Sequence, residues 1–212
     1  MLEYALAFIA GALVKLVDWM DDERKTSLAR KLPLALAYGL IIGYLISSST
    51  FSVLFLAALL AQVFARKVDT PAHRAGFLVA GLSLVYFGFP QLDLLLLAIF
   101  LVLAFLDELD YIGRYRWITE TRPFLKLGAL VPAIVGIWDF FIAIAAFDIG
   151  YELAGRAARS YARSEAASRP VPKVVLVAPP PAPEGAQAEV PQEAKPKAPR
   201  KKKKAGPKTQ KP

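Results

Sequence analysis

The sequence contains no cysteine and a single histidine, His73. Without cysteine, the chain can form no disulfide framework, thiolate nucleophile or thiolate-ligated metal site. One histidine also excludes a His-rich metal site within a single chain. A metal ion bound by this protein would therefore depend mainly on oxygen ligands.

Most of the chain also lacks net charge. The 212 residues carry a formal net charge of +8, and residues 191–212 alone contain nine basic residues against one acid, Glu193. The first 190 residues are therefore neutral overall, and the basic character of the protein belongs to its C-terminal end.

Apolar residues are abundant, at 56% of the sequence with a mean hydropathy of +0.42. They form five segments of 15 or 16 residues, followed by a longer sixth. A helix of that length measures about 24 Å, somewhat less than the hydrocarbon core of about 30 Å. Almost no charge interrupts the segments, which leaves a globular bundle no polar outer face. The segments are 2–17, 33–48, 51–65, 75–89, 92–106 and 124–150.

We therefore predict an all-α fold, a polytopic membrane helix bundle with five spans and a sixth hydrophobic segment. The sixth segment either crosses once, which places Asp139 near the bilayer midplane, or folds back at Gly136–Asp139 with help from Pro132. The first interpretation makes Asp139 a candidate for ion or solute transport.

Basic residues indicate an orientation for such a bundle. The connections after the first, third and fifth segments hold eleven arginines and lysines, and those after the second and fourth hold none. By the positive-inside rule the N-terminus lies outside a cell membrane, and the fold-back alternative returns the C-terminus to the cytoplasm. The predicted localisation is thus a multi-pass cell-membrane protein.

Three regions follow from these patterns. Residues 1–150 form the transmembrane helical domain, and residues 151–169 form an amphipathic, basic juxtamembrane helix. Residues 170–212 contain eleven of the sixteen prolines and no aromatic residue, which predicts a disordered Pro/Lys-rich cytoplasmic tail.

Two pairs of carboxylates lie near the inner ends of predicted helices. Asp18 and Asp22 are four residues apart and Asp107 and Asp110 are three apart, so each pair shares one helix face. Such oxygen ligands suit Mg²⁺, which commonly bridges to a substrate phosphate. We predict a metal site at Asp18, Asp22, Asp107 and Asp110, with simple capping of the helix ends as the alternative.

Basic residues near the same ends are candidates for phosphate binding. The acid spacing differs from the DxxDGxxAR pattern of CDP-alcohol phosphotransferases, and the NDxxDxxxD pattern of aromatic prenyltransferases is absent. The sequence favours metal-assisted binding or transfer of a lipid phosphate or prenyl diphosphate at the cytoplasmic interface, with no family assigned. The candidate residues are Lys15, Lys67, Arg74, Arg114 and Arg116.

The polybasic end supports a second hypothesis, a non-enzymatic membrane anchor or scaffold. Such a cluster binds nucleic acid or ribosomal phosphates in a salt-dependent way, or anionic lipid headgroups of a bilayer. A small transporter that uses Asp139 is a third hypothesis. The densest part of the cluster is Arg200, Lys201, Lys202, Lys203 and Lys204.

Overall fold

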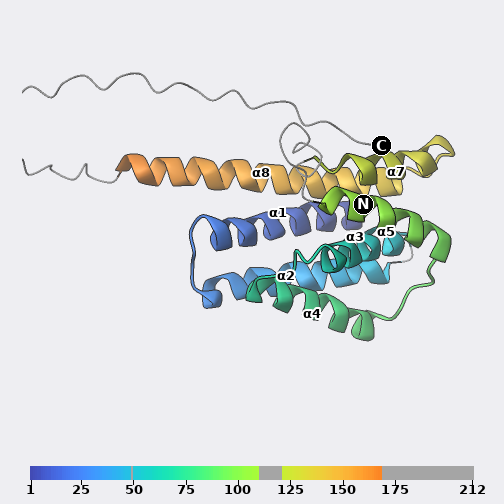
Figure 1. Ribbon diagram of the computed structural model, residues 1–212, viewed down its shortest axis with the longest axis horizontal. Helices are drawn as coiled ribbons and strands as arrows, with labels where there is room; N and C mark the ends of the chain where they lie inside the picture. Colours follow the sequence, from blue (N-terminus) through green and yellow to red (C-terminus); the bar gives the residue numbers. More distant parts are fainter. Residues whose placement is uncertain (49, 110–120, 169–212) are drawn as a thin grey trace, which may run out of the picture. The chain divides into compact units, whose positions relative to one another are not determined.

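The computed structural model describes residues 1–168 apart from residue 49 and residues 110–120 (Figure 1). Every regular element in this part of the chain is an α-helix, so the predicted all-α class is confirmed. The chain divides into units Met1–Pro170 and Val171–Pro212, and all described residues belong to the first. The helices are α1 (Leu2–Asp22), α2 (Leu28–Ser47), α3 (Ser52–Phe64), α4 (Pro71–Phe87), α5 (Leu94–Glu108), α7 (Pro123–Ile134) and α8 (Asp139–Ser168).

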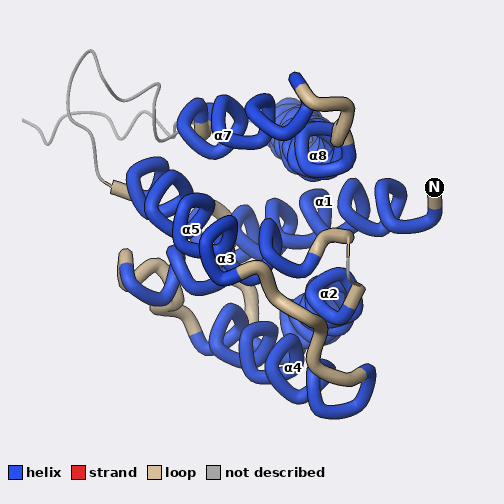
Figure 2. Tube along the Cα trace, turned by 90° about the vertical axis from the view of Figure 1, so that its right-hand side faces the viewer, coloured by secondary structure: helices blue, strands red, loops and turns tan. Residues whose placement is uncertain are grey.

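Six of these helices close a ring. In the end view, α1 lies between α8 and α2, α3 lies between α2 and α5, and α7 lies beside α8 (Figure 2). Contacts between α5 and α7, α7 and α8, α3 and α5, and α2 and α3 complete the circuit. The remaining helix, α4, packs against the outside of α2. A ring of this kind leaves room for side chains from many helices to meet near its middle.

Two glycines allow α1 and α8 to pack backbone against backbone. A Cβ atom on Gly11 would lie 2.0 Å from the carbonyl oxygen of Phe147, and one on Gly150 would lie 2.0 Å from that of Phe8. Neither distance is possible for a real side chain, so only glycine fits at these crossings. The approach brings the functional groups of α1 and α8 within reach of each other.

Some helices begin at the capping and proline residues that are typical of a helix N-terminus, and one does not. Thr70 caps α4, since its side chain accepts a hydrogen bond from the backbone nitrogen of His73 at 3.3 Å, and Pro71 occupies the first helical position. Pro123 likewise occupies the start of α7. The predicted start at Pro33 was wrong, because α2 begins five residues earlier and includes that proline.

The prediction of five membrane spans is contradicted by the helix lengths. Among the residues that the structure describes, α2 alone is both long and apolar enough to cross a membrane, and a buried core helix or a signal sequence meets the same criteria. The helices α3 and α7 have 13 and 12 residues, which is about 20 Å or less against a hydrocarbon core of about 30 Å. The described helices instead pack together as a bundle.

The charge content of the longer helices leads to the same correction. The 21 residues of α1 include Lys15 and three aspartates in its second half, and the 30 residues of α8 become polar after Asp148. With at most one candidate span, the multi-pass cell-membrane localisation is not supported, nor is the orientation that placed the N-terminus outside. The positive-inside rule compares the connections between successive spans, so it does not apply to a bundle with at most one candidate span.

The sixth apolar segment divides between two helices. The chain turns between α7 and α8, with Gly136 at φ 92°, close to the position predicted for a break. Asp139 begins α8 and accepts a hydrogen bond from the hydroxyl of Tyr4, so it is not placed in the middle of a span. Helix α8 continues without interruption to Ser168, and the predicted helix at 151–169 forms its second half.

Candidate functional site

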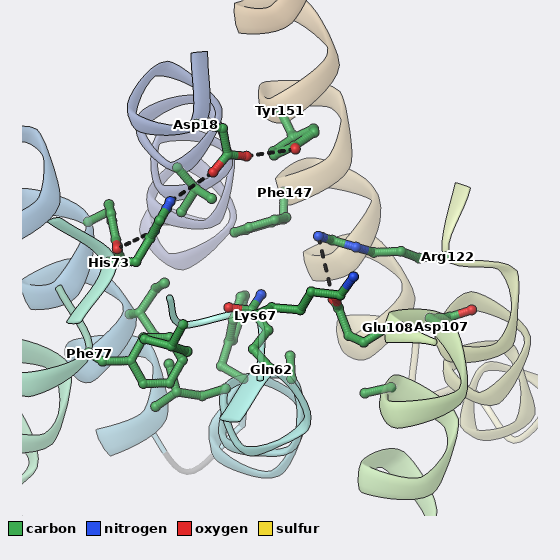
Figure 3. A pocket seen from close by; sticks show the side chains of 18 of the residues that line it. Asp18, Gln62, Lys67, His73, Phe77, Asp107, Glu108, Arg122, Phe147 and Tyr151 are labelled. Carbon is green, nitrogen blue, oxygen red and sulfur yellow. Dashed lines mark hydrogen bonds and ion pairs between the residues drawn. The ribbon is translucent and has the colours of Figure 1, made fainter. Parts of the chain in front are cut away.

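A cavity of about 470 Å³ lies where the helices of the ring converge (Figure 3). Its size is typical of pockets for small ligands, which range from about 300 to 1,000 Å³. One part of the wall is apolar and another carries charged side chains. The apolar part includes Val14, Ile42, Leu54, Phe55, Phe77 and Phe147.

The best-defined polar group at the cavity is centred on His73. Its Nε2 lies 2.9 Å from Oδ1 of Asp18, and its Nδ1 lies 2.9 Å from the hydroxyl of Tyr38. The other oxygen of Asp18 accepts a hydrogen bond of 2.8 Å from the hydroxyl of Tyr151. The network thereby connects α1, α2, α4 and α8, and Thr70 fixes the start of the helix that carries the imidazole.

Burial and hydrogen bonding have opposite effects on the pKa values of His73 and Asp18. Burial alone would lower the pKa of His73, but the hydrogen bond to Asp18 and the nearby charges of Asp18, Asp21 and Asp69 outweigh it and raise the pKa. Burial likewise opposes ionisation of Asp18, yet the hydrogen bonds from His73 and Tyr151 lower the pKa of that carboxyl. The pair therefore favours an imidazolium next to a carboxylate.

Asp107 reaches the cavity from α5, but both of its oxygens are engaged with backbone. They accept hydrogen bonds from the backbone nitrogens of Phe124 at 3.0 Å and Leu125 at 2.7 Å. Its side chain thus satisfies two donors at the start of α7 that have no partner within the helix. Burial raises the pKa of Asp107 more than these hydrogen bonds and the charge of Arg122 lower it.

A second polar group contains Arg122, a residue that the sequence did not single out as a ligand. Its guanidinium lies 3.6 Å from Glu108 and 3.9 Å from Asp148, and 5.6 Å from the ring centroid of Tyr151. The backbone of Arg122 is left-handed, with φ 47° and ψ 57°. Only the position of an arginine before Pro123 was visible in the sequence, and it indicated neither the conformation nor the neighbours.

The cavity brings together four of the nine residues predicted for metal or phosphate binding. Lys15 lies beside it, with its Nζ 3.3 Å from the hydroxyl of Tyr151, whereas Arg74 is exposed on α4 and does not line it. Asp110, Arg114 and Arg116 lie outside the described residues, as do Arg200 and the four lysines after it. The four residues at the cavity are Asp18, Asp22, Lys67 and Asp107.

Acidic side chains outnumber basic ones around the cavity. Six carboxylates line it, against Arg66, Lys67, Arg122 and the imidazolium of His73. Within residues 1–168, excluding the gaps, no three His, Asp or Glu side chains are grouped so as to hold a metal ion by themselves. The carboxylates are Asp18, Asp21, Asp22, Asp69, Asp107 and Glu108.

Some of these acids already have basic partners. Asp21 forms an ion pair with Lys31 and accepts a hydrogen bond of 3.0 Å from Thr70, and Glu108 faces Arg122. Asp22 and Asp69 are exposed at the rim. A divalent cation would therefore find solvent-accessible oxygen donors at the rim, while the deeper acids support the fold.

Comparison with known proteins finds no matching family model, no similar curated protein and no similar solved structure.

Proposed function

We propose that the cavity binds a small amphiphilic phosphate, such as a lipid phosphate or prenyl diphosphate, together with Mg²⁺. The observation that supports this proposal is that Asp18, Asp22 and Lys67 line the same cavity as an apolar wall. The wall suits a hydrocarbon chain, since pockets for small molecules are mostly apolar with a few placed polar groups. The cations beside it suit a phosphate.

The charge balance explains why a metal ion belongs to the proposal. Six carboxylates against four cationic side chains, His73 included, would repel a free diphosphate. Mg²⁺ prefers oxygen ligands and is usually held by one or two carboxylates plus the phosphates of the substrate. Asp22 and Asp69 have the right donor chemistry for this role, and a preformed site of three protein ligands is not required. The ion would neutralise the phosphate as it enters.

The proposal concerns binding and not a particular transfer reaction. Both ring nitrogens of His73 are occupied, one by Asp18 and the other by Tyr38. The imidazole therefore offers no free nitrogen to take a proton from a substrate, and we assign it a positioning role at the cavity.

A titration of the purified full chain with geranyl diphosphate tests the proposal. We expect saturable binding with Mg²⁺, and at least about tenfold weaker binding after chelation or in Asp22→Asn, because one charge-assisted contact contributes about 1.5–3 kcal/mol. Glu3→Gln is the matched control, since it removes an acid at the opposite end of the same helix. Equal affinity with and without Mg²⁺, or no saturable binding, contradicts the proposal.

The polybasic C-terminal end favours a second candidate function, recruitment of a polyanion such as a ribosome, nucleic acid or anionic lipid surface. The supporting observation is the concentration of nine basic residues within 191–212. Clusters of this density bind phosphates through release of counterions and do not require a folded site.

A further inference from the structure

The backbone at Arg122 is strained in a way that local sequence does not favour. Its φ of 47° and ψ of 57° lie in the left-handed region, which costs free energy for any residue with a Cβ atom. Such a conformation persists only where the surrounding structure imposes it, and it is often found at functional sites. The position of the guanidinium therefore calls for an explanation beyond the local chain.

The conformation places the guanidinium at the cavity wall between charged and aromatic groups. Figure 3 shows Arg122 pointing toward Phe147 and Glu108, with a dashed line that joins it to Glu108. The guanidinium carbon lies 6.0 Å from the ring centroid of Phe147 and 5.6 Å from that of Tyr151. Aromatic faces attract a cation and limit its movement.

The acidic partners of Arg122 hold it loosely. Its distances of 3.6 Å to Glu108 and 3.9 Å to Asp148 exceed the 2.7–3.2 Å of an N–H···O hydrogen bond. Asp148 also pairs with Lys126 at 2.6 Å, so its charge is shared. Among the described residues, none accepts a hydrogen bond from the guanidinium, so within this part of the chain its N–H groups retain capacity for a ligand.

We infer that Arg122 is the residue that binds the phosphate of the ligand in this cavity, by directing two of its N–H groups to phosphate oxygens. The inference rests on the proposed function and names the group that recognises the anionic head. A planar guanidinium matches phosphate geometry better than an ammonium does, because it presents parallel donors in a fixed arrangement. Lys67, which also lines the cavity, would add a point charge.

The substitution Arg122→Gly separates phosphate binding by this side chain from a contribution of the side chain to the fold. Arg122→Gly removes the guanidinium, and glycine adopts a left-handed backbone without strain, so the substitution introduces no new backbone strain. Lys25→Gly is the matched control: Lys25 is also basic, also has a positive φ of 46°, and does not line the cavity. The C-terminal end is identical in both variants, so any background binding of anions to it cancels.

The test compares geranyl diphosphate with geraniol, its uncharged alcohol, on the full chain in the presence of Mg²⁺. We expect Arg122→Gly to bind the diphosphate roughly 10- to 100-fold more weakly than Lys25→Gly does, and to bind the alcohol equally well. Equal diphosphate affinity of the two variants overturns the inference and leaves the proposed function standing. An equal loss for diphosphate and alcohol also overturns it, since it indicates a damaged cavity.

A second probe, inorganic diphosphate, keeps the two proposals distinguishable. If geranyl diphosphate does not bind to the unmodified chain, the proposed function fails. A weaker affinity of Arg122→Gly than Lys25→Gly for inorganic diphosphate would still support a phosphate site at Arg122. Equal affinities for inorganic diphosphate in that case would overturn the inference as well.

Discussion

His73 connects three helices through one side chain. Its two ring nitrogens face Asp18 of α1 and Tyr38 of α2, while its own backbone belongs to α4. Because the pairing with Asp18 raises the pKa of the imidazole above its ordinary value, the network contributes to folding in a pH-dependent way. The first consequence of the structure at this scale is therefore a pH dependence of stability.

We expect His73→Gln to destabilise the protein by about 1 kcal/mol at pH 5.5, or about 2–4 °C in Tm, and by less at pH 8.5. The folded pKa of His73 is higher than the unfolded value of about 6.5, so its stabilisation is complete below that pH and is lost as the pH rises through the folded pKa. Thermal denaturation followed by circular dichroism measures the difference.

Tyr38→Phe is the control for this experiment. It removes the hydrogen bond at the other ring nitrogen of His73 without removing the charge pair with Asp18. Its cost should change less between the two pH values than the cost of His73→Gln does. A constant difference between His73→Gln and the unmodified protein from pH 5.5 to 8.5 would show that the imidazole contributes no linked proton.

At the scale of the helix, the crossing of α1 and α8 depends on Gly11 and Gly150. An alanine at either position would bring its Cβ to 2.0 Å from a backbone carbonyl oxygen of the other helix. We expect Gly150→Ala to cost about 1–3 kcal/mol, because overpacking of a tight contact forces the helices apart. The free energy of unfolding in urea measures this cost.

Gly81→Ala provides the comparison within the same fold. Gly81 lies inside α4, and nothing is within 4 Å of the position that its Cβ would occupy. Alanine should therefore stabilise the protein by up to about 1 kcal/mol through its higher helix propensity. If both variants changed stability in the same direction, the close packing of α1 and α8 would not be the cause.

The positions of the helices could largely be predicted from the sequence, but their surroundings could not. Apolar segments located most of the helices, and the start of α4 carries a local sequence signal, Thr70 followed by Pro71, because capping depends on neighbours in the chain. Hydropathy does not tell whether an apolar residue meets lipid or another helix. Phe100 and Leu54 were assigned to spans, yet they are fully buried in the bundle.

The candidate site shows the same limit. The four-residue spacing of Asp18 and Asp22 predicted that they would share a side, and both line the cavity. Asp107 accepts hydrogen bonds from backbone donors at the start of α7, which lie 17 and 18 residues away in the sequence. Arg122 has a left-handed backbone conformation, which depends on the path of the chain. Helical periodicity contains no information of that kind.

At the scale of the whole molecule, charge is divided unevenly along the chain. Residues 1–190 are neutral and residues 191–212 carry a net charge of +8. Attraction to polyanions should therefore be removed with the last 22 residues, while the bundle and its cavity remain. Salt dependence is the property that identifies such an interaction.

Deletion of residues 191–212 should reduce co-sedimentation with ribosomes, with duplex RNA or with vesicles of anionic lipid by about tenfold or more at low salt. The unmodified chain should lose the same affinity as the salt concentration rises, because released counterions drive binding.

Whichever of the three polyanions retains most binding at physiological salt identifies the partner class. Deletion of residues 178–190, which contain no basic residue, is the matched control. Unchanged binding of all three polyanions after the first deletion would eliminate the recruitment function.

The walls of the cavity extend along the sequence from Val14 to Tyr151, with contributions from every helix of the ring and from α4. No fragment of the chain could assemble such a pocket, so occupancy must be coupled to cooperative unfolding of the bundle. A compound that binds only the native state stabilises it by RT ln(1 + [L]/Kd), where [L] is the concentration of free ligand, and therefore raises the melting temperature. A library of metabolites screened by differential scanning fluorimetry would thus reveal the physiological ligand even if its chemistry differs from that of the compounds chosen above.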